Sequence, residues 1–163
     1  MKIFLCVILA VLLTGCTQPK DFETMSDSYI EPELPLAKRV DFQLPEDAAK
    51  AVLEAAGTGT LYLCDGYTVA VQTLPAGNLD ATVREVTGYG ADQVQLWQRK
   101  EGDIARYSCV WASAGEGGDQ MGKATILDDG SYHYVLTVMA PAVDAGNLTE
   151  TWNILMDSFR IAP

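Results

Sequence analysis

The sequence predicts an α+β domain, in which an antiparallel sheet of about six strands carries helices mainly on one of its faces. Three observations lead to this prediction. β-rich runs come in pairs, tight turns with Asp-Gly or Gly-Asp separate the members of each pair, and segments with helical periodicity stand between the pairs. The expected order of elements is α-ββ-α-ββ-ββ-α, within one globular domain over residues 44–163.

The first predicted helix covers residues 45–57. Pro45 suits a first helical turn, Glu46 and Asp47 complement the positive end of the helix dipole, and Gly57 suits its end. Its apolar face would consist of Ala49, Val52, Leu53 and Ala56.

Three hairpins supply the strands of the predicted sheet. An Asp-Gly step between β-rich runs indicates a tight turn, and it occurs at residues 65–66 and again at 129–130. A turn at residues 100–103 contains Gly102 and closes the remaining hairpin. The predicted strands cover residues 61–64, 67–74, 93–99, 104–113, 122–127 and 131–139.

Two further helices have clear boundary signals. Asn78 can cap a helix that ends at Gly88. Asn147 and Glu150 have the spacing of a capping box and begin the last helix. The apolar stripe of that helix consists of Leu148, Trp152, Leu155, Met156 and Phe159.

The two halves of the domain share the word Ala-Gly-Asn-Leu, at residues 76–79 and 145–148, each time after a hairpin and a proline. Either a ββα unit is duplicated, or both copies use the same turn and capping chemistry. The order of the elements resembles the small α/β/α sandwiches of the photosystem II extrinsic-protein type.

The N-terminus predicts export and lipid attachment. Lys2 precedes an unbroken apolar run over residues 3–13, which is shorter than the roughly 20 residues that a membrane-spanning helix needs. Leu13-Thr14-Gly15-Cys16 resembles the lipobox of bacterial lipoproteins. The resemblance implies cleavage after residue 15 and lipidation of Cys16. The protein would then be held outside the cytoplasm on a bacterial cell membrane or envelope by acyl chains such as palmitate.

Residues 16–43 are predicted to be a lipidated, acidic, proline-containing tether. Cleavage after residue 15 removes one basic residue, which leaves 10 Lys and Arg against 22 Asp and Glu, a formal charge of −12. This excess of acid argues against nucleic-acid binding and against electrostatic docking on anionic lipid. We therefore expect the protein to bind the membrane through its lipid anchor alone.

Cys64 and Cys109 are the two cysteines that remain after signal removal and lipidation. An even pair in an exported protein predicts a disulfide, and the alternative is two free thiols packed as small apolar groups.

Two motifs partly match ligand-binding patterns, one for a nucleotide and one for calcium, but both are incomplete. Residues 117–123 spell a nucleotide-binding loop up to its lysine, but Ala124 replaces the required hydroxyl residue and a hairpin follows where a helix is needed. Residues 128–130 lack the full calcium-loop pattern and are explained by the turn. We therefore expect no nucleotide, no metal and no cofactor.

His133 and Trp97 are the candidate residues of a binding surface. His133 is the only histidine, and alternation places it on the face of its strand opposite to Tyr132 and Tyr134. Trp97 alternates with Leu96 and so falls among polar neighbours. No serine has the context of a nucleophile, so we expect no catalytic residue.

The sequence therefore predicts a membrane-anchored extracytoplasmic lipoprotein with a non-catalytic binding or interaction domain. Its partner would be an envelope protein or a small ligand. The alternatives are a structural or assembly lipoprotein of the cell envelope and a hydrolase that uses His133.

Overall fold

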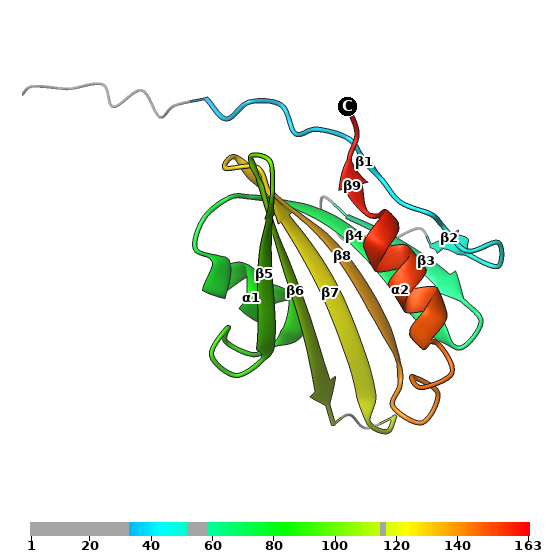
Figure 1. Ribbon diagram of the computed structural model, residues 1–163. Helices are drawn as coiled ribbons and strands as arrows, with labels where there is room; N and C mark the ends of the chain where they lie inside the picture. The colour runs from blue at the N-terminus through cyan, green and yellow to red at the C-terminus, as the bar shows by residue number, and fades with distance from the viewer. Residues whose placement is uncertain (1–32, 52–58, 115–116) are drawn as a thin grey trace, which may run out of the picture. The chain divides into compact units, whose positions relative to one another are not determined.

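A seven-stranded antiparallel sheet with a helix on each face is the centre of the structure, a computed structural model that describes residues 33–51, 59–114 and 117–163 (Figure 1). The strand order is β2-β3-β4-β8-β7-β6-β5. The strands are β2 (Ala49–Ala51), β3 (Gly59–Cys64), β4 (Tyr67–Pro75), β5 (Gln95–Glu101), β6 (Ile104–Ser113), β7 (Gln120–Asp128) and β8 (Tyr132–Pro141). Two short strands, β1 (Val40–Asp41) and β9 (Arg160–Ile161), pair with each other separately.

The structure confirms the α+β class and the six predicted strands, which are β3 to β8. The turns that the sequence predicts between them are also present. Gly66, Gly102 and Gly130 adopt φ values of 77°, 62° and 86°, in the left-handed region that glycine enters without steric cost.

The predicted helix over residues 45–57 is wrong where the structure describes it. Residues 49–51 form β2, which pairs with residues 61–63 of β3, and residues 52–57 lie outside the described part of the chain. Small side chains such as Ala49 and Ala51 fit either structure, so the free edge of β3 decides the outcome by offering backbone hydrogen bonds.

The other two helices lie where the sequence predicts them. In α1 (Leu79–Thr87) the Asn78 side chain accepts a hydrogen bond from the Asp80 N–H, and Gly88 ends the helix with φ 79°. Along α2 (Thr149–Ser158) and its two caps the predicted apolar stripe is buried except at Leu148, which is partly buried, but the capping box is absent. Leu148 occupies the N-cap position and makes no side-chain capping bond.

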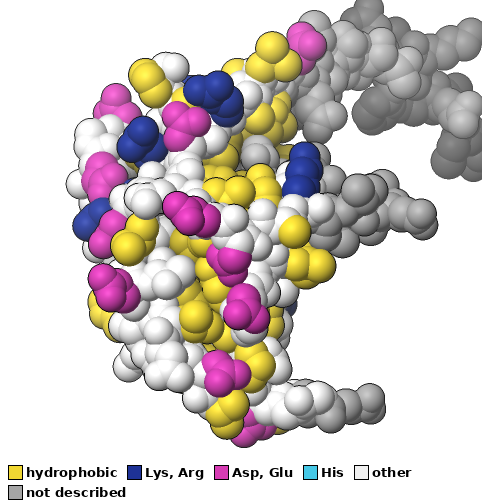
Figure 2. Space-filling model, turned by 90° about the vertical axis from the view of Figure 1, so that its right-hand side faces the viewer, with side chains coloured by type: hydrophobic (Ala, Val, Ile, Leu, Met, Phe, Trp, Pro, Cys, Tyr) yellow, Lys and Arg dark blue, Asp and Glu magenta, His cyan; other side chains and the backbone are white. Residues whose placement is uncertain are grey.

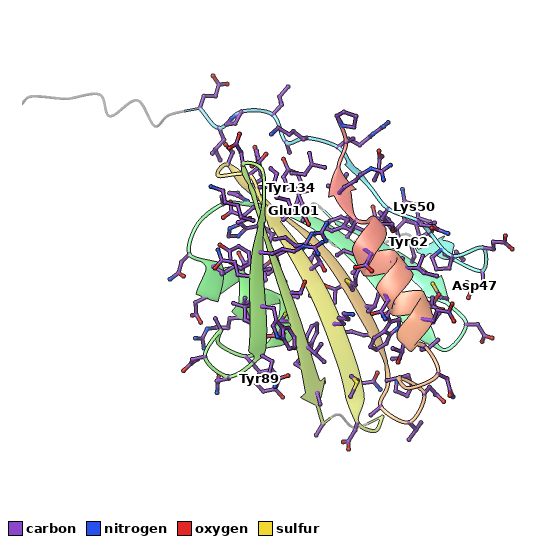
Figure 3. All side chains as sticks on the ribbon, viewed as in Figure 1. Asp47, Lys50, Tyr62, Tyr89, Glu101 and Tyr134 are labelled. Atoms are coloured by element: carbon purple, nitrogen blue, oxygen red, sulfur yellow. The ribbon has the colours of Figure 1, made fainter. Side chains whose placement is uncertain are left out.

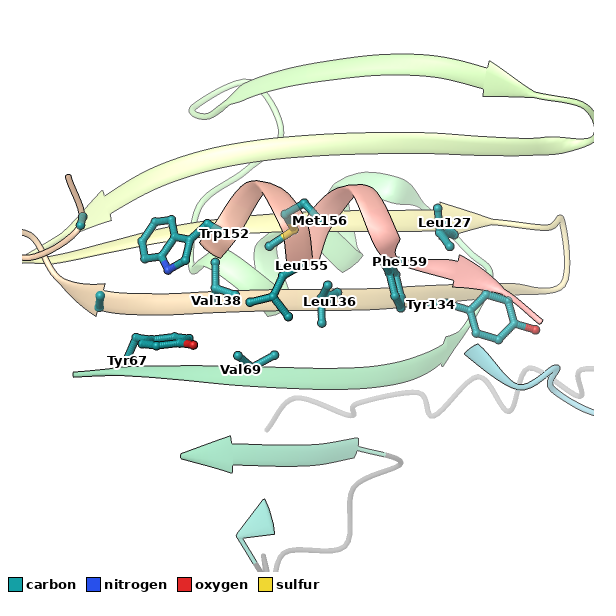
Figure 4. Packing of buried hydrophobic residues seen from close by; sticks show 12 residues of the cluster. Tyr67, Val69, Leu127, Tyr134, Leu136, Val138, Trp152, Leu155, Met156 and Phe159 are labelled. Carbon is teal, nitrogen blue, oxygen red and sulfur yellow. The ribbon is translucent and has the colours of Figure 1, made fainter. Parts of the chain in front are cut away.

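The helices lie on opposite faces of the sheet, which corrects the prediction that they share one face (Figure 1). β8 is buried on both sides, so its two alternating sets of side chains serve two cores. Leu136 and Val138 pack with Leu155 of α2 (Figure 4). Val135, one residue away, packs with Val83 of α1. A sequence with apolar residues on both faces of a strand does not say which helix covers which face.

The segment before β1 is fixed to the end of the sheet, so the predicted domain boundary at Leu44 lies too late in the chain. The Lys38 N–H donates to the Tyr134 hydroxyl at 2.9 Å, and the Lys38 ammonium lies 3.0 Å from the Asp129 carboxylate. β1 then pairs with β9 through Val40 and Ile161.

Asp129 is the polar centre of this attachment. Burial alone would raise its pKa, but hydrogen bonds from the Tyr132 N–H, the Lys38 ammonium and the Ser131 N–H hold the pKa below its ordinary value. A carboxyl group whose pKa is lowered by folding stabilises the folded state in its charged form.

Replacing Asp129 with Asn should lower the free energy of unfolding at pH 7 by about 1–3 kcal/mol, since hydrogen bonds to a charged acceptor are weakened. The stabilisation is fully present above the unfolded-state pKa and is lost as the pH falls through the lower folded-state pKa. The difference between the two proteins should therefore shrink below about pH 4. Urea unfolding from pH 3 to pH 7 measures it, and a difference independent of pH would contradict this role of Asp129.

Candidate binding groove

α2 covers only part of its face of the sheet and leaves a groove beside it. α2 packs over β4, β7 and β8, and its end reaches Arg106 of β6, while no helix of the described residues lies above the side chains of β5 on this face. The hollow has a volume of about 390 Å³. We call it the Trp97 groove, lined by Trp97, Gln98, Arg99, Arg106, Ser108, Val110, Lys123, Thr125, Met156 and Asp157.

Trp97 forms the outer wall of the groove. It lies on β5 opposite Ser108, and its neighbours on the same face are Gln95 and Arg99. With 53% of its surface exposed, it is the one exposed tryptophan, because Trp111 and Trp152 are buried. A large aromatic side chain exposed among polar groups is typical of contact surfaces. The predicted outward position of Trp97 is confirmed.

Arg106 lies under the inner wall and holds α2 in place. Its guanidinium donates to the carbonyl oxygens of Met156, at 3.1 Å, and Phe159. These carbonyls belong to the end of α2, where the helix offers them no partner of its own. A positive charge there also complements the negative end of the helix dipole.

Glu101 joins the two arginines of the groove. One of its carboxylate oxygens lies 2.6 Å from Nε of Arg99 and 3.2 Å from Nε of Arg106. The second contact is an ion pair by distance, but its angle does not meet the geometry of a hydrogen bond. Figure 3 shows Glu101 at the end of β5. One carboxylate therefore serves two guanidinium groups, and Arg99 is largely exposed to solvent.

Polar contacts across the groove hold the remaining wall. The Lys123 ammonium donates to the Asn153 side chain of α2 at 2.8 Å, and the Thr125 hydroxyl contacts the Met156 sulfur at 3.2 Å. A smaller hollow of about 170 Å³, which shares Val110 and Lys123 with the groove, extends toward Trp152.

The structure does not bring His133 to this surface. It lies on the opposite face under α1 and is 1% exposed. Its Nδ1 is 2.7 Å from the Thr82 hydroxyl, and its Nε2 is 3.8 Å from the Asp128 carboxylate. His133 is a core residue with polar partners, so its predicted place in a binding surface with Trp97 is wrong.

Cys64 and Cys109 are separate thiols, and the predicted disulfide is wrong for this fold. They lie on β3 and β6, with β4, β8 and β7 between them. Four strand spacings amount to about 19 Å, whereas a disulfide needs Cα atoms within about 7 Å. They also face opposite sides of the sheet, since Cys64 packs with the α2 core and Cys109 with the α1 side.

The two ligand-like motifs are local structure. Residues 120–123 of the nucleotide-like stretch belong to β7, and the next element along the chain is the strand β8 instead of a helix. The side chains of Asp128 and Asp129 accept backbone N–H groups of the turn itself. No cluster of three or more metal-ligating side chains occurs among residues 33–51, 59–114 and 117–163.

The charged residues of the groove are what the sequence reasoning missed. Arg106 alternates with Ile104 and Ser108, on the face where β7 presents Leu127. An arginine at an inward position of a strand is costly unless it is paired, so Arg106 could have been identified from the sequence as a residue with buried partners.

No helix in the described part of the chain is long and apolar enough to cross a membrane.

The comparisons with known proteins identify a fold and no family. No family model matches the chain, and no curated protein matches it significantly. Similar solved structures include the cyanobacterial PsbP protein CyanoP of Synechocystis sp. PCC 6803, with TM-score 0.56, 11% identity, and coverage of 76% of this chain and 86% of that chain.

Two further similar structures come from other organisms. LpqN of Mycobacterium tuberculosis has TM-score 0.51 and 14% identity, and the match covers 79% of this chain and 86% of that one. The Ran-binding protein Mog1p of Saccharomyces cerevisiae has TM-score 0.52 and 10% identity, with 78% and 96% covered. At such identities the likeness shows the fold alone. It agrees with the resemblance in the order of elements.

The thiols provide a direct check of the sheet order. In a Cys6→Ser, Cys16→Ser variant that is denatured without reductant, two thiols should react with Ellman's reagent. In the folded protein Cys64 should react first, because burial raises the pKa of Cys109 to about 11 and hides its sulfur. A reduced sample is the control, and an absence of reactive thiols in the unreduced denatured sample would show that a bridge had formed.

Proposed function

We propose that this protein is a lipid-anchored, extracytoplasmic interaction domain that binds a partner protein through the Trp97 groove and catalyses no reaction itself. The anchor would be the lipidated Cys16, and the acidic segment after it would let the domain reach partners away from the bilayer. Cys16 lies outside the residues that the structure describes.

The observation that carries the proposal is the exposed Trp97 beside a groove of defined composition. Tryptophan, arginine and methionine are enriched at protein interfaces, and Trp97, Arg99 and Met156 meet in this groove. Ser108 supplies a hydroxyl group on its floor, whereas the buried Thr125 hydroxyl donates to the Met156 sulfur. This combination of an aromatic wall and convergent polar groups favours binding of a ligand surface.

The acidic surface outside the groove argues against direct binding of the folded domain to anionic lipid. Figure 2 shows acidic side chains distributed over the side that carries α2 and the β2–β3 edge, with few basic ones among them. Such a surface is repelled by anionic headgroups, so membrane attachment would depend on the acyl chains.

Two similarities support an interaction role. LpqN is involved in cell envelope biogenesis, and Mog1p binds Ran. A hydrolase based on His133 is disfavoured, because a substrate cannot approach an imidazole that is 1% exposed under α1.

Lipidation is tested by labelling cells with an alkyne analogue of palmitate. The wild-type protein and a Cys6→Ser variant should incorporate the label, because Cys6 leaves with the signal. A Cys16→Ser variant should not, because the acceptor thiol is gone. Label in that variant, or none in the wild type, would remove the anchor from the proposal.

The groove is tested by cross-linking in native membranes with the lipidated protein, followed by mass spectrometry. Trp97→Ala should reduce recovery of the main cross-linked partner by about tenfold or more, as expected for a central interface residue. Val143→Ala is the matched control, since Val143 is also apolar and is 87% exposed away from the groove. Equal recovery with all three proteins would contradict binding through Trp97.

A further inference from the structure

We propose that β5 accepts an extended acidic peptide segment of the partner protein as an additional antiparallel strand. A carboxylate of that segment would lie against Arg99, and an apolar side chain would lie against Trp97. This inference rests on the proposed function, because it specifies the segment of the partner that would contact Trp97 and Arg99 along the outer side of the groove.

The edge of β5 is available for pairing. β5 is the last strand of the sheet, and within the described residues only β6 pairs with it. It is seven residues long, whereas β2 at the opposite edge has three. A strand of this length at an edge presents a row of unpaired N–H and C=O groups, and peptide recognition by strand addition uses such a row.

The register of the β5–β6 hairpin indicates which groups face outward. Glu101 and Ile104 close a two-residue loop, and in such a loop the closing residues form a hydrogen-bonded pair. Antiparallel pairs alternate, so the backbone groups of Gln98, three residues before Glu101, point to the free edge. The Gln98 side chain contacts the Tyr107 hydroxyl directly opposite at 3.4 Å, as expected for a closely spaced, non-hydrogen-bonded pair.

An added strand would place alternate side chains beside the groove. Trp97 and Arg99 are two residues apart and face the same side of the sheet. Two side chains of a paired peptide, also two residues apart, would therefore lie opposite them at about 5 Å between Cβ atoms. The side chains between them would fall on the α1 side, where Gln98 and Lys100 lie. The groove thus selects for two positions of the peptide and leaves the others open.

The charge of the groove favours an acidic side chain. Arg99 and Arg106 share the single carboxylate of Glu101, and Lys123 bonds a neutral amide. Asp157 is the acidic residue of the lining, so with Glu101 beside it three cations face two carboxylates in a protein of net charge −11. A carboxylate opposite Arg99 would balance the excess positive charge of the groove.

The same charges disfavour a second copy of this chain as the occupant. Arg99 and Lys100 are consecutive on β5 and face opposite sides of the sheet, so pairing two copies of β5 would add two basic side chains to each face of the seam. Basic side chains on an edge strand are a common means by which proteins avoid self-association.

The experiment measures binding of two blocked, fluorescently labelled peptides to the lipidated protein in detergent micelles by fluorescence anisotropy. The first peptide is Thr-Val-Glu-Thr-Phe-Val-Thr, in which the glutamate and phenylalanine share a face at the required spacing. The second has lysine in place of glutamate. The wild-type protein should bind the glutamate peptide at least about tenfold more tightly than the lysine peptide. This corresponds to a difference of about 1.4 kcal/mol in binding free energy.

Variants of β5 separate charge from strand pairing. Arg99→Glu should reverse the preference between the peptides, while Arg84→Glu, at an exposed arginine of α1, should leave it unchanged. Gln98→Pro should abolish binding of both peptides, because it removes an outward N–H, and proline is tolerated on edge strands. Urea unfolding checks that this variant is folded, and if it is not, the reversal by Arg99→Glu decides the matter.

Three results would overturn the inference: equal binding of the two peptides, unchanged binding by a folded Gln98→Pro variant, or a concentration-dependent dimer that Gln98→Pro abolishes. The proposed function fails separately. If cross-linking in membranes depends on Trp97 while the peptide results are negative, the groove binds its partner without strand addition. If the peptides bind as expected but the cross-linked partner does not depend on Trp97, the interaction role of the groove falls.

Discussion

The buried guanidinium of Arg106 is the constraint on which the placement of α2 depends. It satisfies the carbonyls of Met156 and Phe159 and lies near the Glu101 carboxylate. Removing a guanidinium from water costs several kcal/mol unless hydrogen-bond partners replace the solvent. A shift of α2 along the sheet would take these carbonyl partners away and is therefore unfavourable. The helix is therefore held over β7 and β8. On this face β5 and the Ser108–Val110 part of β6 stay uncovered, and the groove lies there because Arg106 holds the end of the helix away from them.

The same end of the molecule is closed by a second polar arrangement. Phe159 ends α2 and is fully buried, and β9 follows at once to pair with β1. The chain before β1 is held by Lys38 on the Asp129 carboxylate and the Tyr134 hydroxyl. Asp129 belongs to the β7–β8 turn and Tyr134 to β8, so the hairpin, the segment of residues 38–41 and the end of α2 stabilise one another. Separation of any one of these would leave a charged or hydrogen-bonding group without its partner.

The sequence contains the local elements of this fold but not their arrangement. Alternation and the Asp-Gly turns predict β3 to β8, because strand periodicity and turn chemistry are properties of neighbouring residues. Strand order depends on which distant segments pair, so neither the edge strand β2 nor the distance between Cys64 and Cys109 was predictable. Trp97 was identified from alternation alone. Arg99 lies on the same strand, and the register of the predicted β5–β6 hairpin sets it opposite Arg106. Met156 joins them only through the packing of α2, which the sequence did not predict.

The opposite placement of the two helices also bears on the repeated Ala-Gly-Asn-Leu word. β4 and β8 are antiparallel neighbours, so a twofold axis that relates the hairpins β3–β4 and β7–β8 stands perpendicular to the sheet. Such an axis would leave α1 and α2 on the same face. They occupy different faces, and Asn78 caps its helix while Asn147 does not. The shared word therefore reflects reuse of turn chemistry. The asymmetry has a functional consequence: α1 and the loop after it cover β6 on one face through Cys109 and Trp111. On the other face, α2 lies over β8 and leaves β5 open, and this is the side on which we propose that a partner binds.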